Sequence, residues 1–218
     1  MREGRPTGTA TVLFTDLVGS TDLLSRLGES AYDEVRRNHF AALREALARH
    51  NGEEVKTLGD GVLAVFGSAA DAVSAGVDIQ RAVDRESRVG SVALAVRVGI
   101  ALGDVSFEQE DVFGTPVVEA AGLVAVAQPG QILTTAAVRW AGGSRSGESF
   151  IDGGLLNLKG PREPRLAASM RPMGTSPPRR RPRSASALPP GWPAPGSSGP
   201  GCCSSGTSPE ISSGPVTC

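Results

Sequence analysis

The sequence of 218 residues has few aromatic side chains, almost no net charge and no long apolar run. Aromatic residues make up 4% of the chain, so the core has to be built from Val, Leu, Ile and Ala. Lys and Arg number 22 against 23 Asp and Glu, which excludes a nucleic-acid-binding protein that depends on bulk positive charge. No apolar run approaches the ~20 residues of a membrane-spanning helix. No apolar stretch of signal-peptide type follows the first six residues, which predicts a cytoplasmic protein.

Charge and proline content divide the chain at about residue 170. Residues 1–170 carry 17 Lys and Arg against 22 Asp and Glu, whereas residues 171–218 carry five Arg against one Glu. Eleven of the 16 prolines and all three cysteines also fall in residues 171–218. With little to bury, this segment is predicted to be a disordered tail rich in Pro, Ser, Gly and Arg. Its run Arg179–Arg181 could contact an acidic surface, but a solvated tail without chemistry is the simpler interpretation.

Hydrophobic periodicity predicts one α+β domain in residues 1–170. Apolar and β-branched runs predict strands, and apolar residues that recur every three to five positions predict helices. Asp-Gly between two apolar runs is a strong hairpin signal, so Gly59–Gly61 should join two strands. The order of elements is typical of an antiparallel, ferredoxin-like sheet with helices. The expected strands are 9–16, 54–58, 62–66, 92–102, 131–134 and, more weakly, 150–158; the expected helices are 22–27, 30–50, 69–85 and one that begins near Pro116.

The first candidate for chemistry is the octapeptide Phe14–Thr21, with the sequence FTDLVGST. In it an acidic residue, Asp16, closes a buried strand, and a turn of small residues opens a helix. A carboxylate at a strand end can hold a hard cation, and the free N–H groups of the turn and helix start can bind phosphate oxygens. The octapeptide alone is equally compatible with Asp16 ending a strand and Ser20 capping a helix.

The second candidate is the segment Lys56–Gly61, with the sequence KTLGDG. Alone, it is best explained as a hairpin turn in which Asp-Gly supplies a positive φ. Together with the first segment, however, it supplies two aspartates, Asp16 and Asp60, from neighbouring strands. Mg²⁺ is usually bound through one or two carboxylates together with substrate phosphates. The pair therefore also fits a site for a nucleotide triphosphate and its metal.

These segments, in this order, resemble the catalytic domain of class III nucleotidyl cyclases, above all the bacterial, actinobacterial adenylate cyclases. The likeness covers residues 9–168 and is carried by FTDLVGST, KTLGDG, RVGIALGDV and DVFGTPVVEAA. One motif alone would be weak, but the ordered set is specific. The resemblance implies a ferredoxin-like α+β fold and the conversion of ATP into 3′,5′-cyclic AMP and pyrophosphate with two Mg²⁺ or Mn²⁺ ions. It also implies a dimer, with an identical chain or a related cyclase domain, whose active sites lie across the subunit interface.

The resemblance also implies roles for individual residues. Asp16 and Asp60 match the catalytic aspartates that bind the metals, and the Leu17 carbonyl matches a further metal ligand. Lys56 and Asp111 match the pair from the opposite subunit that recognises adenine, although a solvated strand lysine and an acidic loop residue would explain them more simply. A Lys donor suits N1 and an Asp acceptor suits the N6 amine, whereas guanine presents the reverse pattern, which favours ATP. The other substrate-binding candidates face phosphates: Gly19, Ser20, Thr21 and Lys159.

Two positions depart from the family pattern. The family usually has an asparagine where this chain has Val118, and an arginine where it has Gly122. In the family those side chains orient the ribose and stabilise charge on the α-phosphate. Losing one such donor typically costs ~10²–10³-fold in turnover. We therefore expect reduced turnover, unless another group such as Arg97 or Arg139 supplies the missing charge.

The sequence leaves three functions open. The first is an adenylate cyclase of reduced activity, which the aspartate pair favours. The second is a degraded cyclase domain that binds nucleotide or regulates a partner by dimerisation, which Val118 and Gly122 favour. The third is a purely structural dimerisation domain. Cyclase domains tend to continue past the LKG motif with a final strand and often another domain, so the tail 171–218 is also compatible with a frame-shifted gene end.

Overall fold

The computed structural model describes residues 7–90, 92–156, 158 and 165–170. All of them lie in the first of two compact units, 1–179 and 180–218. The predicted tail and Lys159 lie outside the described residues. The elements are β1 (Gly8–Leu17), α1 (Ser20–Leu27), α2 (Glu29–Arg49), β2 (Glu53–Leu58), β3 (Gly61–Phe66), α3 (Ala69–Val89), β4 (Val96–Glu108), β5 (Asp111–Phe113), α4 (Thr115–Val126), β6 (Ile132–Thr135), α5 (Ala136–Ser146), β7 (Ile151–Leu156) and β8 (Arg165–Met170).

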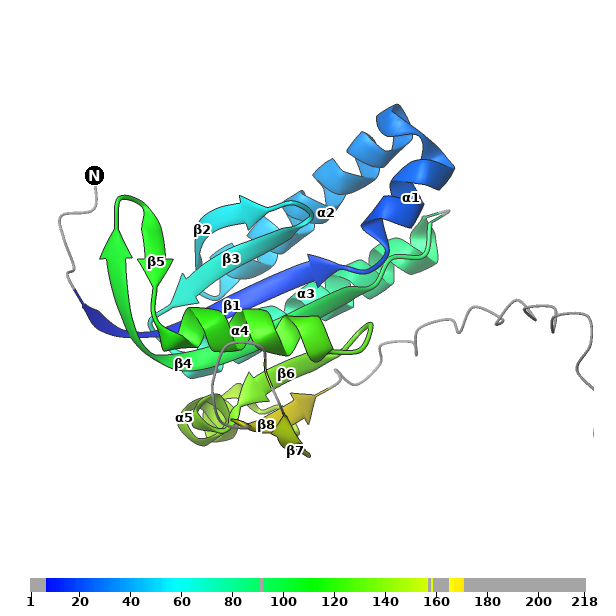
Figure 1. Cartoon of the computed structure of the whole chain (residues 1–218). Helices are drawn as coiled ribbons and strands as arrows, with labels where there is room; N and C mark the ends of the chain where they lie inside the picture. The colour runs from blue at the N-terminus through cyan, green and yellow to red at the C-terminus, as the bar shows by residue number, and fades with distance from the viewer. Residues whose placement is uncertain (1–6, 91, 157, 159–164, 171–218) are drawn as a thin grey trace, which may run out of the picture. The chain divides into compact units, whose positions relative to one another are not determined.

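One sheet of eight strands runs through the described residues of this unit (Figure 1). Its order is β2-β3-β1-β4-β6-β8-β7, and β5 pairs with β4 beside this path. β1 pairs antiparallel with both β3 and β4, β2 pairs antiparallel with β3, and β4 pairs in parallel with β6. The predicted α+β fold with a mainly antiparallel sheet is therefore confirmed. No helix in the described ranges is long and apolar enough to cross a membrane.

Successive side chains of β1 point to opposite faces of the sheet, and each face carries its own apolar core. Leu13 packs in the larger cluster, with side chains from α2, α3 and α5. Ala10 and Val12 point the other way, into a second cluster that includes Ala120 of α4. Figure 1 shows α4 in front of the sheet, with α2 and α3 behind it. Even-numbered residues of β1, which include Asp16, therefore belong to the α4 face.

Glycines in β4 allow α4 to lie directly on the strand. A Cβ at Gly99 would lie 2.3 Å from the Ala120 carbonyl oxygen and 2.9 Å from the Val124 nitrogen. A Cβ at Gly103 would lie 2.9 Å from the Pro116 ring. Backbone atoms cannot move away as a flexible side chain can, so the position of α4 on β4 depends on the two glycines.

Two predicted starts are wrong by two residues or more, each for a local reason, and the predicted ends of α3 and β4 fall four and six residues short. α1 begins at Ser20 rather than at residue 22, because Gly19, at φ 73°, takes the N-cap position and Ser20 is already helical. β4 begins at Val96 rather than at residue 92. The preceding residues bond elsewhere: the Leu94 N–H donates to the Ser87 hydroxyl, which donates to the Leu94 carbonyl, both at 2.8 Å.

The sequence analysis missed β5, α5 and β8. β5 has three residues and follows an acidic turn in which Gln109 and Glu110 have positive φ. α5 contains Gly142 and Gly143, and glycine costs about 1 kcal/mol relative to alanine inside a helix. These elements form because tertiary packing supports them, which local propensity does not reveal.

Replacing Gly99 with Ala tests the close packing of α4. We expect the free energy of unfolding to fall by about 1–3 kcal/mol or more in urea denaturation, as in other over-packed cores. Gly67→Ala is the matched control, because its Cβ would have no atom within 4 Å and its φ is not positive. It should change stability by less than about 0.5 kcal/mol. Equal stability of the two variants would contradict the close approach of α4 to β4.

Candidate active site

Asp16 and Asp60 lie at the same end of the strands, where β1 ends and the β2–β3 turn begins. The antiparallel pairing of β1 with β3 continues toward the turn, where the Val62 N–H donates to the Thr15 hydroxyl at 2.9 Å. A Cβ on Gly61 would lie 1.9 Å from the Thr15 carbonyl oxygen and 3.3 Å from the Asp16 Cα. Only glycine fits there, and this close contact brings Asp60, the residue before Gly61, beside Asp16.

The two aspartates form a small set of hard oxygen donors. Both are half-buried, so neither is sealed in apolar packing. Leu17 follows Asp16 with its side chain 2% exposed, so only its backbone can take part in a site. In the described part of the chain, no group of three or more His, Cys, Asp or Glu could hold a metal by itself. Two carboxylates and a carbonyl fit an ion such as Mg²⁺ or Mn²⁺ that arrives with substrate phosphates.

Arg97 is a charged neighbour of this pair. It lies directly opposite Asp16 in the β1–β4 register. Its Nε donates to Asp16 Oδ2 at 3.0 Å, and its Nη2 donates to the same oxygen. The sequence analysis names Arg97 only as one possible substitute for the family arginine that Gly122 replaces. Its place beside Asp16 follows from strand register, which the motifs alone do not fix.

The N-terminus of α1 lies directly after β1. Gly19 has left-handed backbone geometry at the N-cap and no side chain with which to cap the helix. Ser20 is half-buried, and Thr21 is exposed. The first N–H groups of a helix have no partner within it, and the helix dipole favours an anion there. This end of α1 can therefore receive phosphate oxygens next to Asp16.

Lys56 and Asp111 form a second charged pair, between β2 and β5. Lys56 Nζ donates to Asp111 Oδ2 at 2.5 Å, and the Val112 N–H donates to Oδ1 at 2.8 Å. The hydrogen bond from Lys56 and, to a smaller extent, that from the Val112 N–H lower the pKa of Asp111 below its ordinary value. The side chains are 41% and 30% exposed, so a ligand can reach both. The structure thus brings together the two residues that the resemblance assigned to adenine.

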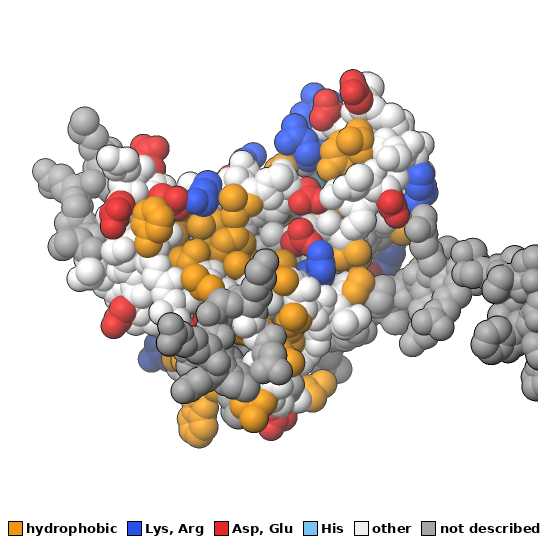
Figure 2. Space-filling view, viewed as in Figure 1, with side chains coloured by type: hydrophobic (Ala, Val, Ile, Leu, Met, Phe, Trp, Pro, Cys, Tyr) orange, Lys and Arg blue, Asp and Glu red, His pale blue; other side chains and the backbone are white. Residues whose placement is uncertain are grey.

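Both charged pairs lie on the α4 face. Lys56 pairs with Leu63, which belongs to the second apolar cluster. Figure 2 shows hydrophobic side chains gathered over this face, with acidic and basic side chains among them. Exposed apolar side chains among polar ones are typical of interaction surfaces. The large exposed apolar side chains of this face are Leu58, Phe113, Val118 and Val126, at 41–47% exposure.

The two departures from the family pattern lie in different surroundings. Val118 is 45% exposed and has no polar atom. Gly122 is buried under Leu158: a Cβ at Gly122 would lie 3.1 Å from the Leu158 Cβ. Leu158 itself packs with α4 and β6 in a third cluster. Arg139 is exposed on α5, which covers the opposite face of the sheet, so of the two suggested substitutes only Arg97 lies near the aspartates.

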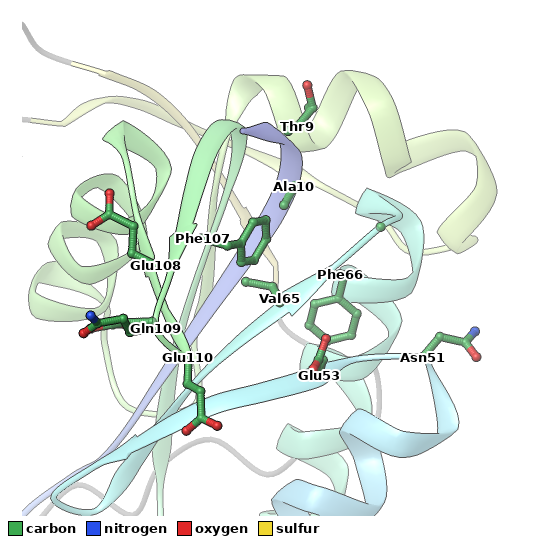
Figure 3. Close-up of a pocket in the computed structure, with 13 residues that line it drawn as sticks. Thr9, Ala10, Asn51, Glu53, Val65, Phe66, Phe107, Glu108, Gln109 and Glu110 are labelled. Carbon is green, nitrogen blue, oxygen red and sulfur yellow. The ribbon is translucent and has the colours of Figure 1, made fainter. Parts of the chain in front are cut away.

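A pocket of about 430 Å³ lies beside the Lys56–Asp111 pair rather than beside the metal-binding candidates. It lies between the β4–β5 hairpin, the start of β1 and the end of β3, and Asp111 lines it. In Figure 3 the side chains of Ala10, Val65 and Phe107 face one another across its floor, and Glu110 lies at its edge. The pocket lies at the start of β1 and is therefore separate from Asp16, which lies near the end of that strand.

The fold is that of nucleotide cyclases. The adenylate/guanylate cyclase/hydrolase structure from Silicibacter pomeroyi matches with a TM-score of 0.68 and 28% identity, over 77% of this chain and 98% of that one. The chain belongs to the family described as "Adenylate and Guanylate cyclase catalytic domain", whose model matches residues 3–166.

Several of the curated relatives carry adenylate cyclase names. Putative adenylate cyclase 3 of Rhizobium meliloti (strain 1021) is 32% identical over 152 residues, which are 69% of this chain and 26% of the relative. An adenylate cyclase of Streptomyces griseus is 34% identical over 126 residues, 58% of this chain and 31% of the relative. The chain thus spans about a third or less of these relatives' length.

Replacing Lys56 with Met tests the second charged pair. We expect the pKa of Asp111 to rise toward its ordinary value of about 3.9, although the Val112 N–H still lowers it. Since the folded pKa is lowered, the pair stabilises the fold above that ordinary pKa and ceases to do so as the pH falls through the lowered value. Carboxyl ¹³C NMR titration measures the change, and Arg44→Met should leave Asp111 unaffected. An unchanged pKa in Lys56→Met would contradict the pairing.

Proposed function

We propose that this chain is an adenylate cyclase catalytic domain that converts ATP into 3′,5′-cyclic AMP and pyrophosphate. The observation that carries the proposal is the placement of Asp16 beside Asp60, fixed by the fit of Gly61 against β1. The N-terminus of α1 lies next to this pair, and the Lys56–Asp111 pair lies on the same face of the sheet. Carboxylates for cations, N–H groups for phosphates and a Lys–Asp pair for a base are the parts that such a site needs.

The residues near Asp16 bind and orient the triphosphate. Asp16, Asp60 and the Leu17 carbonyl would hold two Mg²⁺ or Mn²⁺ ions through hard oxygen donors. Two such ions, when bound, stabilise the attacking 3′ oxygen and the leaving pyrophosphate together. The N–H groups at Gly19–Thr21 would donate hydrogen bonds to oxygens of the phosphate chain. We also assign Lys159 to the phosphates, on the family resemblance alone.

The Lys56–Asp111 pair supports ATP over GTP. The pKa of Asp111 is lowered, so its carboxylate is ionised at neutral pH and only accepts hydrogen bonds. An acceptor fits the N6 amine of adenine, and the ammonium of Lys56 donates to N1. Guanine would place its O6 acceptor against the carboxylate, and a mismatched buried polar group is costly.

A dimer brings the two parts of the site together in this proposal. Lys56 lies two strands from Asp16 and two residues away in register, a Cα separation of roughly 12 Å. Its ammonium is directed to Asp111 on β5. A second copy, or a related cyclase domain, would present its own Lys–Asp pair to the aspartates of the first. The exposed apolar residues of the α4 face would form the contact.

The second candidate function is a nucleotide-binding regulatory domain without turnover. A specific observation favours it: Leu158 fills the space beside Gly122, where the family usually has its arginine. Val118 offers no hydrogen bond to a ribose. Val118 and Gly122 are not among the proposed metal-binding or base-binding residues. Nucleotide affinity would therefore survive even where cyclisation is slow. We therefore propose low turnover for the enzyme.

The direct test measures cyclic AMP formed by the purified full chain from ATP with Mn²⁺. We expect slow product formation, reduced to background in Asp16→Asn and in Asp60→Asn because the cations lose a ligand. Asp104→Asn is the control: Asp104 is exposed and accepts a hydrogen bond from Thr9, away from the site. Saturable Mn²⁺-dependent ATP binding without product would favour the regulatory domain. Neither binding nor product would reject both functions.

Making room at Gly122 should restore turnover. Gly122→Arg alone meets the Leu158 side chain and should lower stability without a gain in kcat. The double variant Gly122→Arg/Leu158→Ala frees the space, and we expect kcat to rise by about tenfold or more as the α-phosphate gains a charged donor. Leu158→Ala alone is the control for loosened packing. A double variant no faster than that control would show that the missing arginine does not limit the rate.

A further inference from the structure

The two carboxylate oxygens of Asp16 have different surroundings. Both N–H groups that Arg97 directs at Asp16 bond to Oδ2. Oδ1 is left to other ligands. A carboxylate that holds two divalent ions with one oxygen each would use Oδ2 for one of them, so Arg97 stands where that ion would bind.

The Arg97–Asp16 pair differs from the other described arginine ion pairs in burial and in origin. The arginines of the other described arginine pairs are 42–55% exposed, whereas Arg97 is 28% exposed. Residues opposite each other in an antiparallel ladder meet without ordering a loop, and here the β1–β4 register provides the contact. In the nucleotide-free structure the guanidinium is therefore placed at Asp16 by the register of the strands rather than by a loop.

We infer that Arg97 gates the second metal ion: it occupies Asp16 Oδ2 until a triphosphate draws its guanidinium away. The inference rests on the proposed function, because it requires a two-ion site. While Arg97 stays in place, Oδ1 of Asp16, Asp60 and the Leu17 carbonyl would be available to hold one ion. A second ion at Oδ2 would be repelled by the guanidinium charge.

The phosphate chain of the nucleotide provides an alternative partner for Arg97. A guanidinium binds phosphate oxygens in the same bidentate manner as carboxylate oxygens. Once Arg97 has moved to a phosphate, Oδ2 is free for the second ion. Nucleotide and second ion therefore favour each other's binding, and by linkage the coupling is reciprocal. Until the nucleotide binds, Arg97 balances the negative charge of Asp16.

The experiment titrates the nucleotide-free full chain with Mn²⁺ alone and follows free Mn²⁺ by electron paramagnetic resonance. We expect the wild type to bind one ion per chain tightly. Arg97→Gln should bind a second ion with a Kd lower than that of the wild type by about tenfold, because one positive charge next to Oδ2 is removed. Arg44→Gln is the matched control, since Arg44 forms a similar two-bond pair with Glu54 far from Asp16.

A second readout separates gating from a merely structural role. In Arg97→Gln the KM for Mn-ATP should rise, because the phosphates lose a donor, while the affinity for Mn²⁺ alone increases. Loss of structure would weaken both. Unchanged Mn²⁺ binding in Arg97→Gln, or weakening of both affinities, would overturn the gate and leave the cyclase proposal standing. Mn²⁺ binding that Asp16→Asn leaves intact would instead overturn the two-aspartate site itself, and the gate with it.

Discussion

The candidate site depends on one contact that leaves no room for a side chain: the backbone of Gly61 lies against Thr15 and Asp16. Because the β2–β3 hairpin can approach β1 this closely, the residue before Gly61 comes to lie beside the end of β1. Two carboxylates that are 44 positions apart in the sequence thus become neighbours without any cluster of acidic residues. A Cβ at this position would have to move backbone rather than a flexible side chain. The geometry of the site is therefore set by the sheet and not by loops.

Each carboxylate of interest, apart from Asp60, already has a cationic partner. Asp16 accepts from Arg97, and Asp111 accepts from Lys56. All four side chains are 28–41% exposed, and ion pairs at such positions contribute little to stability. Under the proposed function their effect is on binding, because each pair presents a donor and an acceptor to a ligand. A triphosphate can compete for Arg97, and a base can contact Lys56 and Asp111 together.

Sequence motifs predicted more of the site than of the fold's details. FTDLVGST and KTLGDG placed Asp16 and Asp60 on neighbouring strands, because each motif joins an apolar run to a turn of small residues. The position of Arg97 could not be predicted, since it depends on which residue of β4 lies opposite Asp16. The start of α1 was missed because Gly19, rather than Ser20, takes the N-cap. β5 and α5 were missed because packing, not local propensity, maintains them.

Under the proposed function, the packing around Gly122 separates nucleotide binding from catalysis. If the family arginine had merely been lost, a water-filled space would remain on α4. Instead Leu158 fills it and joins a cluster with Leu123 and Leu133. That packing stabilises the α4–β6 contact, so replacement of Gly122 by a larger residue meets a steric cost that is unrelated to chemistry. The metal-binding and base-binding candidates lie on β1, β2, β5 and the β2–β3 turn, and none of them contributes to this cluster. Nucleotide affinity and turnover can therefore change independently, because different parts of the α4 face determine them.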